Sequence, residues 1–177
     1  MRFSKKLTFL SVLMAASCAA SAATTGTLTI TGNVVDQTCE VDAGQMTREV
    51  SLGDLSQGTI KSVAVDAAIT SKDLVFDMTK CPSNVKSVGI AFNFTPDASH
   101  TGYLANAGKG KGVLLGITDE SDALVKAGGV VLSKNLDTKA GTAKVTAKVK
   151  AFRTAATDAD IVAGDVSSTA TVTISQN

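Results

Sequence analysis

The sequence predicts an antiparallel β-sandwich, and three observations lead to that fold class. Several short segments alternate apolar and polar residues, which is the spacing of a strand with one buried face. Valine and threonine, which favour strands, are abundant, and no segment has a convincing amphipathic helical pattern. Turns rich in Gly, Ser, Asp and Asn separate the alternating segments, as in all-β sandwiches.

The expected strands follow one another with polar turns between them. In chain order they are Thr27–Thr31, Val34–Val41, Val50–Gly53, Leu74–Met78, Val88–Phe94, Val113–Ile117, Val130–Leu132, Val145–Ala151 and Ala170–Ile174. Pro82 ends the strand that precedes Cys81, and Pro96 ends the next one. The expected loops are Pro96–Gly102, Ala107–Gly112, Thr118–Asp122 and Thr154–Ser168.

The N-terminus has the three parts of a secretory signal peptide. A basic start is followed by an apolar stretch, Leu7–Ala16, that is too short to span a bilayer, and then by the small-residue site Ala20-Ser21-Ala22. Cleavage after Ala22 leaves an exported chain of 155 residues, which suits one domain. The alternative is a lipoprotein signal with Cys18, but Ala15 stands where that signal has a large aliphatic residue.

Removal of the signal peptide changes the cysteine count and the net charge. Cys39 and Cys81 remain, and two cysteines in an exported chain suggest one disulfide. The remaining 14 basic and 16 acidic residues give a net charge of −2, which is not the basic footprint of a nucleic-acid-binding protein. Since His100 is the only histidine, we expect no metal site and no cofactor.

Catalytic side chains are scarce, and we expect no enzyme activity. A Ser-His-Asp triad would have to use His100, which lies in a polar loop without the context of a nucleophile elbow. The acidic pairs of Asp119–Asp122 and Asp158–Asp160 lack the aromatic sugar platforms of a glycosidase, and the first lacks EF-hand spacing. Lys109-Gly110-Lys111-Gly112 lacks the spacing of a phosphate-binding loop, so we interpret it as a solvated turn.

The strand directly after the signal peptide is the most informative feature. It runs from Thr24 to Gly32 and places Gly26, Leu28, Ile30 and Gly32 on one face, with threonines on the other. One interpretation is an ordinary first strand of the sandwich. The other is a strand offered to a neighbouring molecule, because glycine weakens an ordinary strand but allows a foreign backbone to approach closely.

Four segments in order resemble the chaperone–usher pilin family, most closely the type 1 fimbrial major-subunit group. Gly32–Gly44 resembles the opening segment of the family with its first cysteine, and Val50-Ser51-Leu52-Gly53 resembles the V-x-L-G that follows. Leu74–Cys81 is similar to the strand that leads to the second cysteine. Gly164 lies where the C-terminal motif of the family has a glycine, and Ala170–Asn177 resembles its final strand.

The resemblance implies an incomplete immunoglobulin-like β-sandwich that lacks its seventh strand and is completed by a donor strand from a neighbouring subunit. A periplasmic chaperone would fill the groove first, and the next subunit would replace it at an outer-membrane usher. Gly26, Leu28, Ile30 and Gly32 would then be donor residues. Gly164, Ala170, Val172 and Ile174 would line the acceptor edge, and the carboxylate of Asn177 would anchor the chaperone. Two positions depart from the family: Gln176 replaces a frequent tyrosine, and Ala151 replaces a frequent aromatic residue.

We therefore expect a signal peptide at 1–22, a donor-strand extension at 23–32 and a pilin domain at 33–177. The expected function is a structural subunit of a surface fimbria that supports cell adhesion, reached by export through the periplasm. A minor, adaptor or single-domain glycan-binding subunit is the first alternative. A periplasmic β-sandwich hydrolase is the second, and it would need a catalytic cluster that the sequence does not show.

Overall fold

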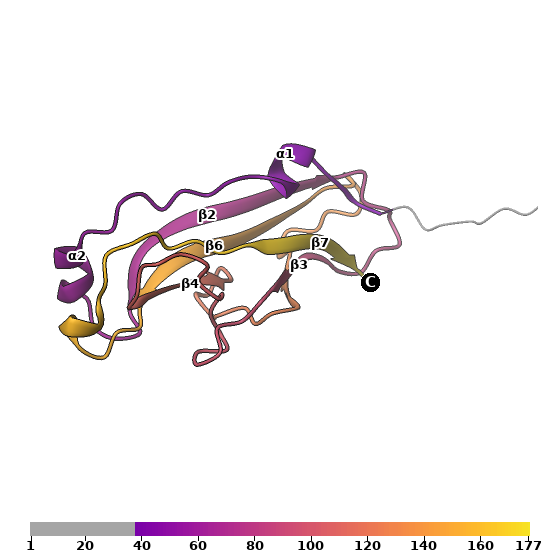
Figure 1. Cartoon of the computed structure of the whole chain (residues 1–177). Coiled ribbons are helices and arrows are strands. Elements are labelled where there is room, and N and C mark those ends of the chain that lie inside the picture. Colours follow the sequence, from indigo (N-terminus) through magenta and orange to yellow (C-terminus); the bar gives the residue numbers. More distant parts are fainter. Residues whose placement is uncertain (1–37) are drawn as a thin grey trace, which may run out of the picture. The chain divides into compact units, whose positions relative to one another are not determined.

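Strands dominate residues 38–177, the part of the chain that the computed structural model describes (Figure 1). The elements are β1 (Glu40–Val41), α1 (Ala43–Met46), α2 (Gln57–Ser62), β2 (Ala68–Thr79), β3 (Val88–Phe94), β4 (Val113–Thr118), β5 (Gly129–Leu132), β6 (Ala143–Arg153), the 3-10 turn η1 (Asp158–Asp160) and β7 (Ala170–Gln176). The expected signal peptide and the expected donor strand at 24–32 lie outside the described residues and stay predictions.

The strands form two antiparallel sheets, as the alternating pattern predicts. One sheet has the order β1-β2-β6-β4, and the other has the order β5-β3-β7. The longest ladder joins β2 to β6, from Ala68 opposite Phe152 to Met78 opposite Ala143. In the second sheet β3 lies between β5 and β7, so that β7 is an edge strand.

The core lies between the two sheets and is made of the inward faces of these strands. Leu74, Phe76 and Met78 of β2 are buried, while the intervening Asp77 is exposed. Phe76 meets Phe92 of β3 edge to face, with ring centroids 6.1 Å apart. The expected strands at 74–78, 88–94, 113–117, 130–132, 145–151 and 170–174 are all confirmed, because each sits on a face that this core buries.

The expected strand at Val50–Gly53 is wrong in the structure, although the chain turns at Gly53, whose φ is 74°. A segment becomes a strand only when another backbone lies beside it, and no described residue supplies one here. The structure also contains α2, which the sequence analysis did not anticipate. Six residues are too few to show a helical period, but Ser56 caps the helix by accepting a hydrogen bond from the Thr59 amide at 3.0 Å.

The segment Lys109–Gly112, inside the expected loop, differs from its prediction as a solvated turn. Its lysines are exposed, but Gly110 is buried against the chain near Gly164. The amide of Gly110 donates to the carbonyl of Asp165 at 2.9 Å, and Lys111 and Val162 exchange two main-chain hydrogen bonds. The glycines are therefore needed for close packing between two backbones.

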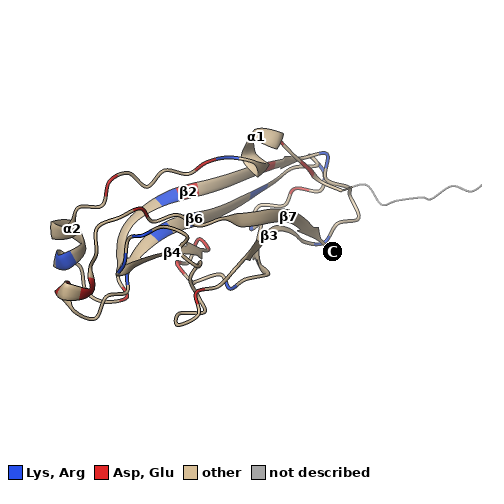
Figure 2. Cartoon of the chain, in the orientation of Figure 1, with Lys and Arg blue, Asp and Glu red and all other residues tan. Residues whose placement is uncertain are grey.

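Charged residues lie mainly outside this core, and β7 carries none (Figure 2). On the outer face of the β1-β2-β6-β4 sheet, Lys148 and Lys150 of β6 both reach Asp122, at 2.9 and 2.8 Å. These pairs hold the turn after β4 against β6. No helix within residues 38–177 has the length and apolar character needed to cross a lipid bilayer.

Candidate functional site

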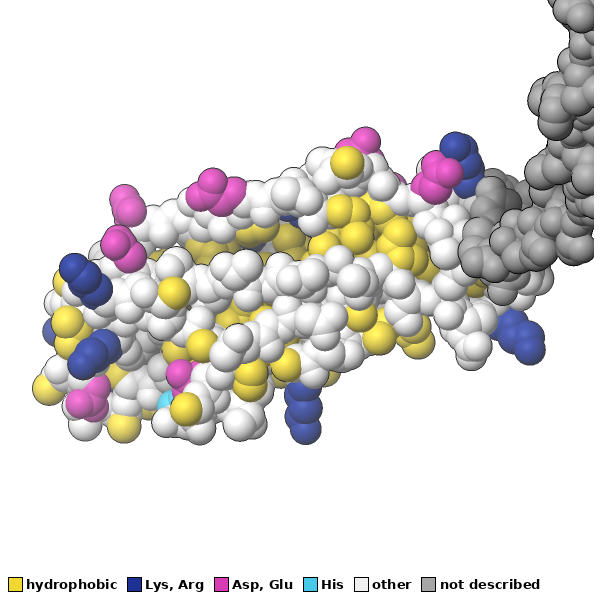
Figure 3. Space-filling view, turned by 45° about the vertical axis from the view of Figure 1, so that its right-hand side comes forward, with side chains coloured by type: hydrophobic (Ala, Val, Ile, Leu, Met, Phe, Trp, Pro, Cys, Tyr) yellow, Lys and Arg dark blue, Asp and Glu magenta, His cyan; other side chains and the backbone are white. Residues whose placement is uncertain are grey.

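A long apolar groove of about 1010 Å³ opens on one side of the domain (Figure 3). One side is residues 47–55, called here the first wall, and the other is residues 161–172, called the second wall. The floor consists of core side chains from four strands. These are Leu74, Phe76, Phe92, Val113, Leu115, Ile117 and Val149. The groove therefore lies directly over the hydrophobic core, whose side chains form its floor.

The first wall lacks main-chain pairing within the described part of the chain. The main-chain groups of residues 48–55 make no hydrogen bond to another main-chain group among residues 38–177. Val50, Leu52 and Leu55 nevertheless turn toward the core and are half-buried or pack against it. This wall is thus an extended segment whose apolar side chains pack against the core and whose peptide groups pair with no other main chain among residues 38–177.

Side chains hold the start of the first wall to the free edge of β2. Gln45 Oε1 accepts a hydrogen bond from the Asp77 amide at 2.7 Å. Arg48 Nη2 donates to the carbonyl of Val75 at 3.2 Å, and its guanidinium lies 4.7 Å from the ring centroid of Phe76. Partial burial lowers the pKa of Arg48. The side chains of Gln45 and Arg48 therefore attach this segment to β2, a task that main-chain hydrogen bonds perform between the paired strands of the sheet.

The second wall, in contrast, is bonded through its main chain along one side. Ala107 N donates to the carbonyl of Ser167 at 2.8 Å, and Lys111 pairs with Val162. Asn106 Oδ1 accepts from the amide of Ser167 at 3.0 Å, and β7 then continues the ladder against β3. The opposite side of this wall faces the groove, and no other strand of residues 38–177 pairs with it there.

Gly164 is part of the second wall, as the family resemblance implies. A Cβ atom at Gly164 would lie 2.6 Å from the amide nitrogen of Gly110, and a Cβ atom at Gly110 would lie 2.6 Å from the carbonyl oxygen of Gly164. Real Cβ atoms do not approach so closely, so these two glycines allow the backbones to pass each other.

The structure brings together most of the predicted acceptor residues. Ala170 and Val172 line the groove beside Gly164, and Ile174 packs against the same core further along β7. Thr171 and Thr173 point the other way and are exposed. The main-chain oxygen of Asn177 accepts from the amides of Lys86 and Ser87, at 2.7 and 3.0 Å, so the last residue closes the β3–β7 ladder.

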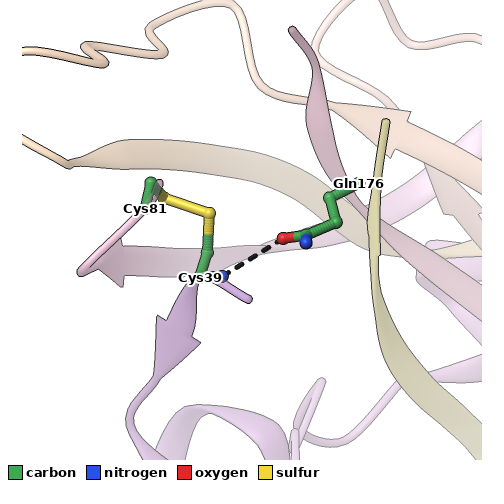
Figure 4. Close-up of a disulfide and its surroundings, with 3 residues drawn as sticks. All are labelled: Cys39, Cys81 and Gln176. Atoms are coloured by element: carbon green, nitrogen blue, oxygen red, sulfur yellow. Dashed lines mark hydrogen bonds between the residues drawn. A yellow bond between two sulfur atoms is a disulfide. The ribbon is translucent and has the colours of Figure 1, made fainter. Parts of the chain in front are cut away.

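The predicted disulfide between Cys39 and Cys81 is present, and it lies beside the end of β7 (Figure 4). Cys39 is also held from the other side, because its amide donates to Gln176 Oε1 at 3.2 Å. Gln176, which replaces the frequent tyrosine, thus connects the last strand to the disulfide. Ala151, the second departure, is fully buried in the small cluster around Ile60 and Ile161.

The catalytic candidates do not assemble into a site. His100 Nδ1 lies 3.3 Å from Asp97 Oδ1 in the loop after β3, with Tyr103 edge-on to the imidazole. Asp122 is engaged with lysines of β6, and Asp158 with Arg153. Within residues 38–177 there is no group of three His, Cys, Asp or Glu side chains that could hold a metal ion.

Several groove residues were not anticipated from the sequence. Arg48, Leu55 and Ile60 come from the first wall and α2, and Ile161 and Val166 come from the segment predicted as a loop. One sequence signal could have revealed the first wall as a longer extended segment than Val50–Gly53. It is the alternation of Met46, Arg48, Val50 and Leu52, which lie two residues apart. The groove can bind an extended chain, because the peptide groups of both walls can form hydrogen bonds with it and the apolar floor can contact its side chains.

Comparisons with known proteins agree with this geometry. Residues 28–176 match the family described as fimbrial protein. The chain is 31% identical to the type-1 fimbrial protein, A chain, of Escherichia coli K12 over 83% of this chain and 85% of that one. It is 30% identical to protein FimG of the same strain, over 72% and 73% of the two chains.

A solved structure of a chaperone–usher pilus has a similar fold. The TM-score is 0.65 at 18% identity, and the match covers 88% of this chain and 98% of that one. The β-rich domain and its two sheets therefore have the incomplete immunoglobulin-like fold of pilins. The chain belongs to the fimbrial protein family: it is a subunit of a chaperone–usher surface pilus, where it polymerises with other pilins, and a structural protein rather than an enzyme.

Proposed function

We propose that the groove is the acceptor site for an extended donor strand, residues 24–32, from the neighbouring subunit of the fibre. The observation that carries the proposal is the pair of walls on either side of an apolar floor, whose edges facing the groove pair with no other strand of residues 38–177. A strand inserted between them would bond to both backbones at once, which is β-augmentation of the kind known for pilins. It would also remove an exposed edge that invites aggregation.

The predicted donor segment suits this groove in its side-chain pattern. Leu28 and Ile30 are two residues apart, so both would face the apolar floor, while Thr27, Thr29 and Thr31 would face solvent. Gly26 and Gly32 on the same face would let the strand lie close to the acceptor backbone. The domain boundaries at 22 and 32 are part of this proposal.

Before polymerisation the same groove needs a temporary occupant. We assign that role to a periplasmic chaperone, which would contact Gly164, Ala170, Val172 and Ile174 and bind Asn177 at the end of β7. An outer-membrane usher would then be the place of exchange. The support is physical: an apolar groove over the core, flanked by two edges that no strand of residues 38–177 pairs, exposes a domain to aggregation in the periplasm.

Deletion of residues 23–31 tests the donor role. We expect the shortened chain to be exported and to fold with the chaperone, but not to enter surface fibres, as judged by electron microscopy and by mass spectrometry of sheared fibres. The matched control replaces Thr27, Thr29 and Thr31 with serine, which keeps the apolar face and should leave fibres intact. Normal fibres that contain the deleted chain would rule out the donor role.

The same sheared fibres distinguish a rod subunit from an adaptor. A rod subunit would be the most abundant pilin in the fibre, whereas an adaptor would be present in a few copies. The N-terminal peptide of the fibre protein also reports the cleavage site, which we expect after Ala22. Fibre binding to a glycan array with and without this chain checks the glycan-binding alternative.

A further inference from the structure

The second wall changes its main-chain partner partway along its length. Residues 162–167, called here the loop-backed half, are bonded through their main chain to residues 107–111. From Ala170 onward the wall is β7, the strand-backed half, which pairs with β3. Ser168 and Thr169 lie between the two ladders and make no main-chain hydrogen bond to another main-chain group among residues 38–177. The second wall is therefore two halves that meet at this junction.

The side chain of Asn106 bonds to the loop-backed half next to the junction. Its Oδ1 accepts hydrogen bonds from the amides of Ser167 and Gly108, at 3.0 and 2.9 Å. Its Nδ2 donates to the carbonyl of Gly110 at 2.8 Å. Because two amides face the oxygen and one carbonyl faces the nitrogen, these contacts fix the orientation of the side-chain amide. One half-buried side chain thus joins the loop to the wall.

The strand-backed side of the junction is tied to the same point of the chain. Ser168 Oγ donates to the carbonyl of Ala105 at 2.8 Å. The amide of Ala105 donates to the carbonyl of Thr95 at 2.9 Å, directly after the end of β3. Since Asn106 follows Ala105 in the chain, it is held where β3 ends. Side-chain hydrogen bonds therefore span the junction that main-chain hydrogen bonds leave open.

The loop transmits its position to the wall because no side chain separates the two backbones. A Cβ atom at Gly108 would overlap the carbonyl oxygen of Asp165, and one at Gly110 would overlap Gly164 in the same way. Backbones in such close contact move together, since packed groups do not interpenetrate. A side chain that fixes the loop therefore also fixes the loop-backed half of the wall.

A donor strand of the predicted length needs both halves in line. Residues 24–32 are nine residues, which span about 30 Å as a strand. The six residues of the loop-backed half span only about 20 Å by the same rise. A bound strand therefore extends past the junction, and it can pair along its whole length only where the two halves form one edge.

We propose that Asn106 is a positioning residue of the acceptor groove: through Ser167 it aligns the two halves of the second wall, so that one donor strand pairs with both. This inference rests on the proposed donor-strand function. Asn106 does not line the groove, so it acts on the bound strand only through the wall.

Hydrogen exchange in the bound peptide tests the alignment. The chain of residues 23–177 is refolded with an excess of an isotope-labelled peptide of residues 23–33, and the exchange of each peptide amide is followed by NMR. In the unmutated complex we expect protected amides toward both ends of the peptide. With Asn106→Ala we expect the amides at one end to exchange about tenfold faster, as for the loss of one or two hydrogen bonds, and those at the other end to change less than about twofold.

Three further variants separate alignment from general stability. Asp137 Oδ1 accepts from the amides of Lys139 and Ala140 at 2.9 and 3.0 Å, in a turn that does not line the groove. Asp137→Ala therefore removes two similar bonds and should not distinguish the ends of the peptide. Asn106→Asp keeps the acceptor for Ser167 and should accelerate exchange by less than about threefold. Ser168→Ala removes only the bond to Ala105 and should give about a threefold change at the same end as Asn106→Ala.

Each outcome has one meaning. Equal acceleration at both ends in Asn106→Ala, or none, would overturn the inference whatever happens to thermal stability, and Ser168→Ala decides in the same way if Asn106→Ala does not fold. A one-ended effect in Asp137→Ala, or Asn106→Asp exchanging as fast as Asn106→Ala, would overturn it too. If the peptide gains no protection even with the unmutated chain, the donor-strand function itself is refuted.

Discussion

The two walls of the groove are built in different ways. The second wall is bonded by its main chain to residues 107–111 and to β3, and it would keep its shape in an empty groove. The first wall is extended but unpaired among the described residues, and it is attached by Gln45, Arg48 and its apolar side chains. The second wall is therefore paired through its main chain, whereas the first wall is held by side chains alone among residues 38–177.

This difference shows what kind of opening the groove is. A ligand pocket has walls that are complete without the ligand, whereas under the proposed function the first wall would complete its main-chain hydrogen bonds only when a donor strand binds. Four measurements test the contrast, from the largest expected effect to the smallest.

Loss of the disulfide should have the largest effect, because it anchors the chain just before the first wall. With Cys39→Ser and Cys81→Ser together, we expect the free energy of unfolding to fall by about 4 kcal/mol, since the bond closes a loop of 42 residues. Guanidinium unfolding of subunits refolded with the donor peptide measures this change. Reduction of the unmutated chain should reproduce it, and an unchanged midpoint in both cases would contradict the anchoring role.

Gly164→Ala should damage the second wall. The added methyl group would lie 2.6 Å from the Gly110 nitrogen, so two bonded backbones must separate, and we expect a loss of about 2 kcal/mol. Gly58→Ala in α2 is the control, because its nearest atom is 3.8 Å away and the change should gain up to about 1 kcal/mol. Equal unfolding midpoints for the two variants would show that the second wall is not rigid.

Arg48→Met should loosen the first wall by less. It removes the contact with the Phe76 ring and the hydrogen bond to Val75, which together contribute about 1–2 kcal/mol. We expect faster dissociation of a labelled donor peptide and a lower unfolding midpoint. Lys72→Met on the exposed side of β2 is the matched loss of charge, and it should change neither quantity. The contrast between the walls fails if both substitutions behave alike.

The smallest effect should come from Asp122, which lies outside both walls. Hydrogen bonds from Lys150 and Lys148 lower the pKa of Asp122 to about 2. Because the pKa is lower in the folded chain than in the unfolded one, the stabilisation is complete above about pH 4 and is lost as the pH falls through about 2. Melting temperatures of the unmutated chain and Asp122→Asn should differ at pH 5 and converge near pH 2. A constant difference across that range would exclude this ion cluster as the cause.

Much of the sandwich could be predicted from the sequence, because a period of two is visible wherever one face is buried. Phe76, Phe92 and Val145 stand on such faces, and all three are in the core. The disulfide could be predicted from the number of cysteines, because removal of the expected signal peptide leaves only Cys39 and Cys81. Gly164, Ala170 and Val172 were placed at the groove by resemblance to pilins, and the structure puts them beside it.

The missed features depend on contacts between distant parts of the chain. Val50–Gly53 has the composition of a strand, but whether it is one depends on a neighbouring backbone, and residues 38–177 do not supply one. Gly110 looks like a residue of a flexible turn until Gly164 is placed against it. Arg153 ends an ordinary alternating strand, and nothing nearby in the sequence reveals that α2 will surround it. Residues 23–32 lie outside the described part, so their role stays a prediction.

The arrangement around Cys39 also has a mechanical consequence for a fibre under tension. Strand β1 is joined to β2 by only two residue pairs, Glu40 with Thr79 and Val41 with Met78. A pull on the chain at residue 38 would first load this short pairing, which by itself would peel apart easily. Because Cys39 is covalently joined to Cys81, the load passes instead into the far end of β2 and its long ladder with β6. Force along that ladder acts on many hydrogen bonds at once, so the weakest strand pair of the domain is spared.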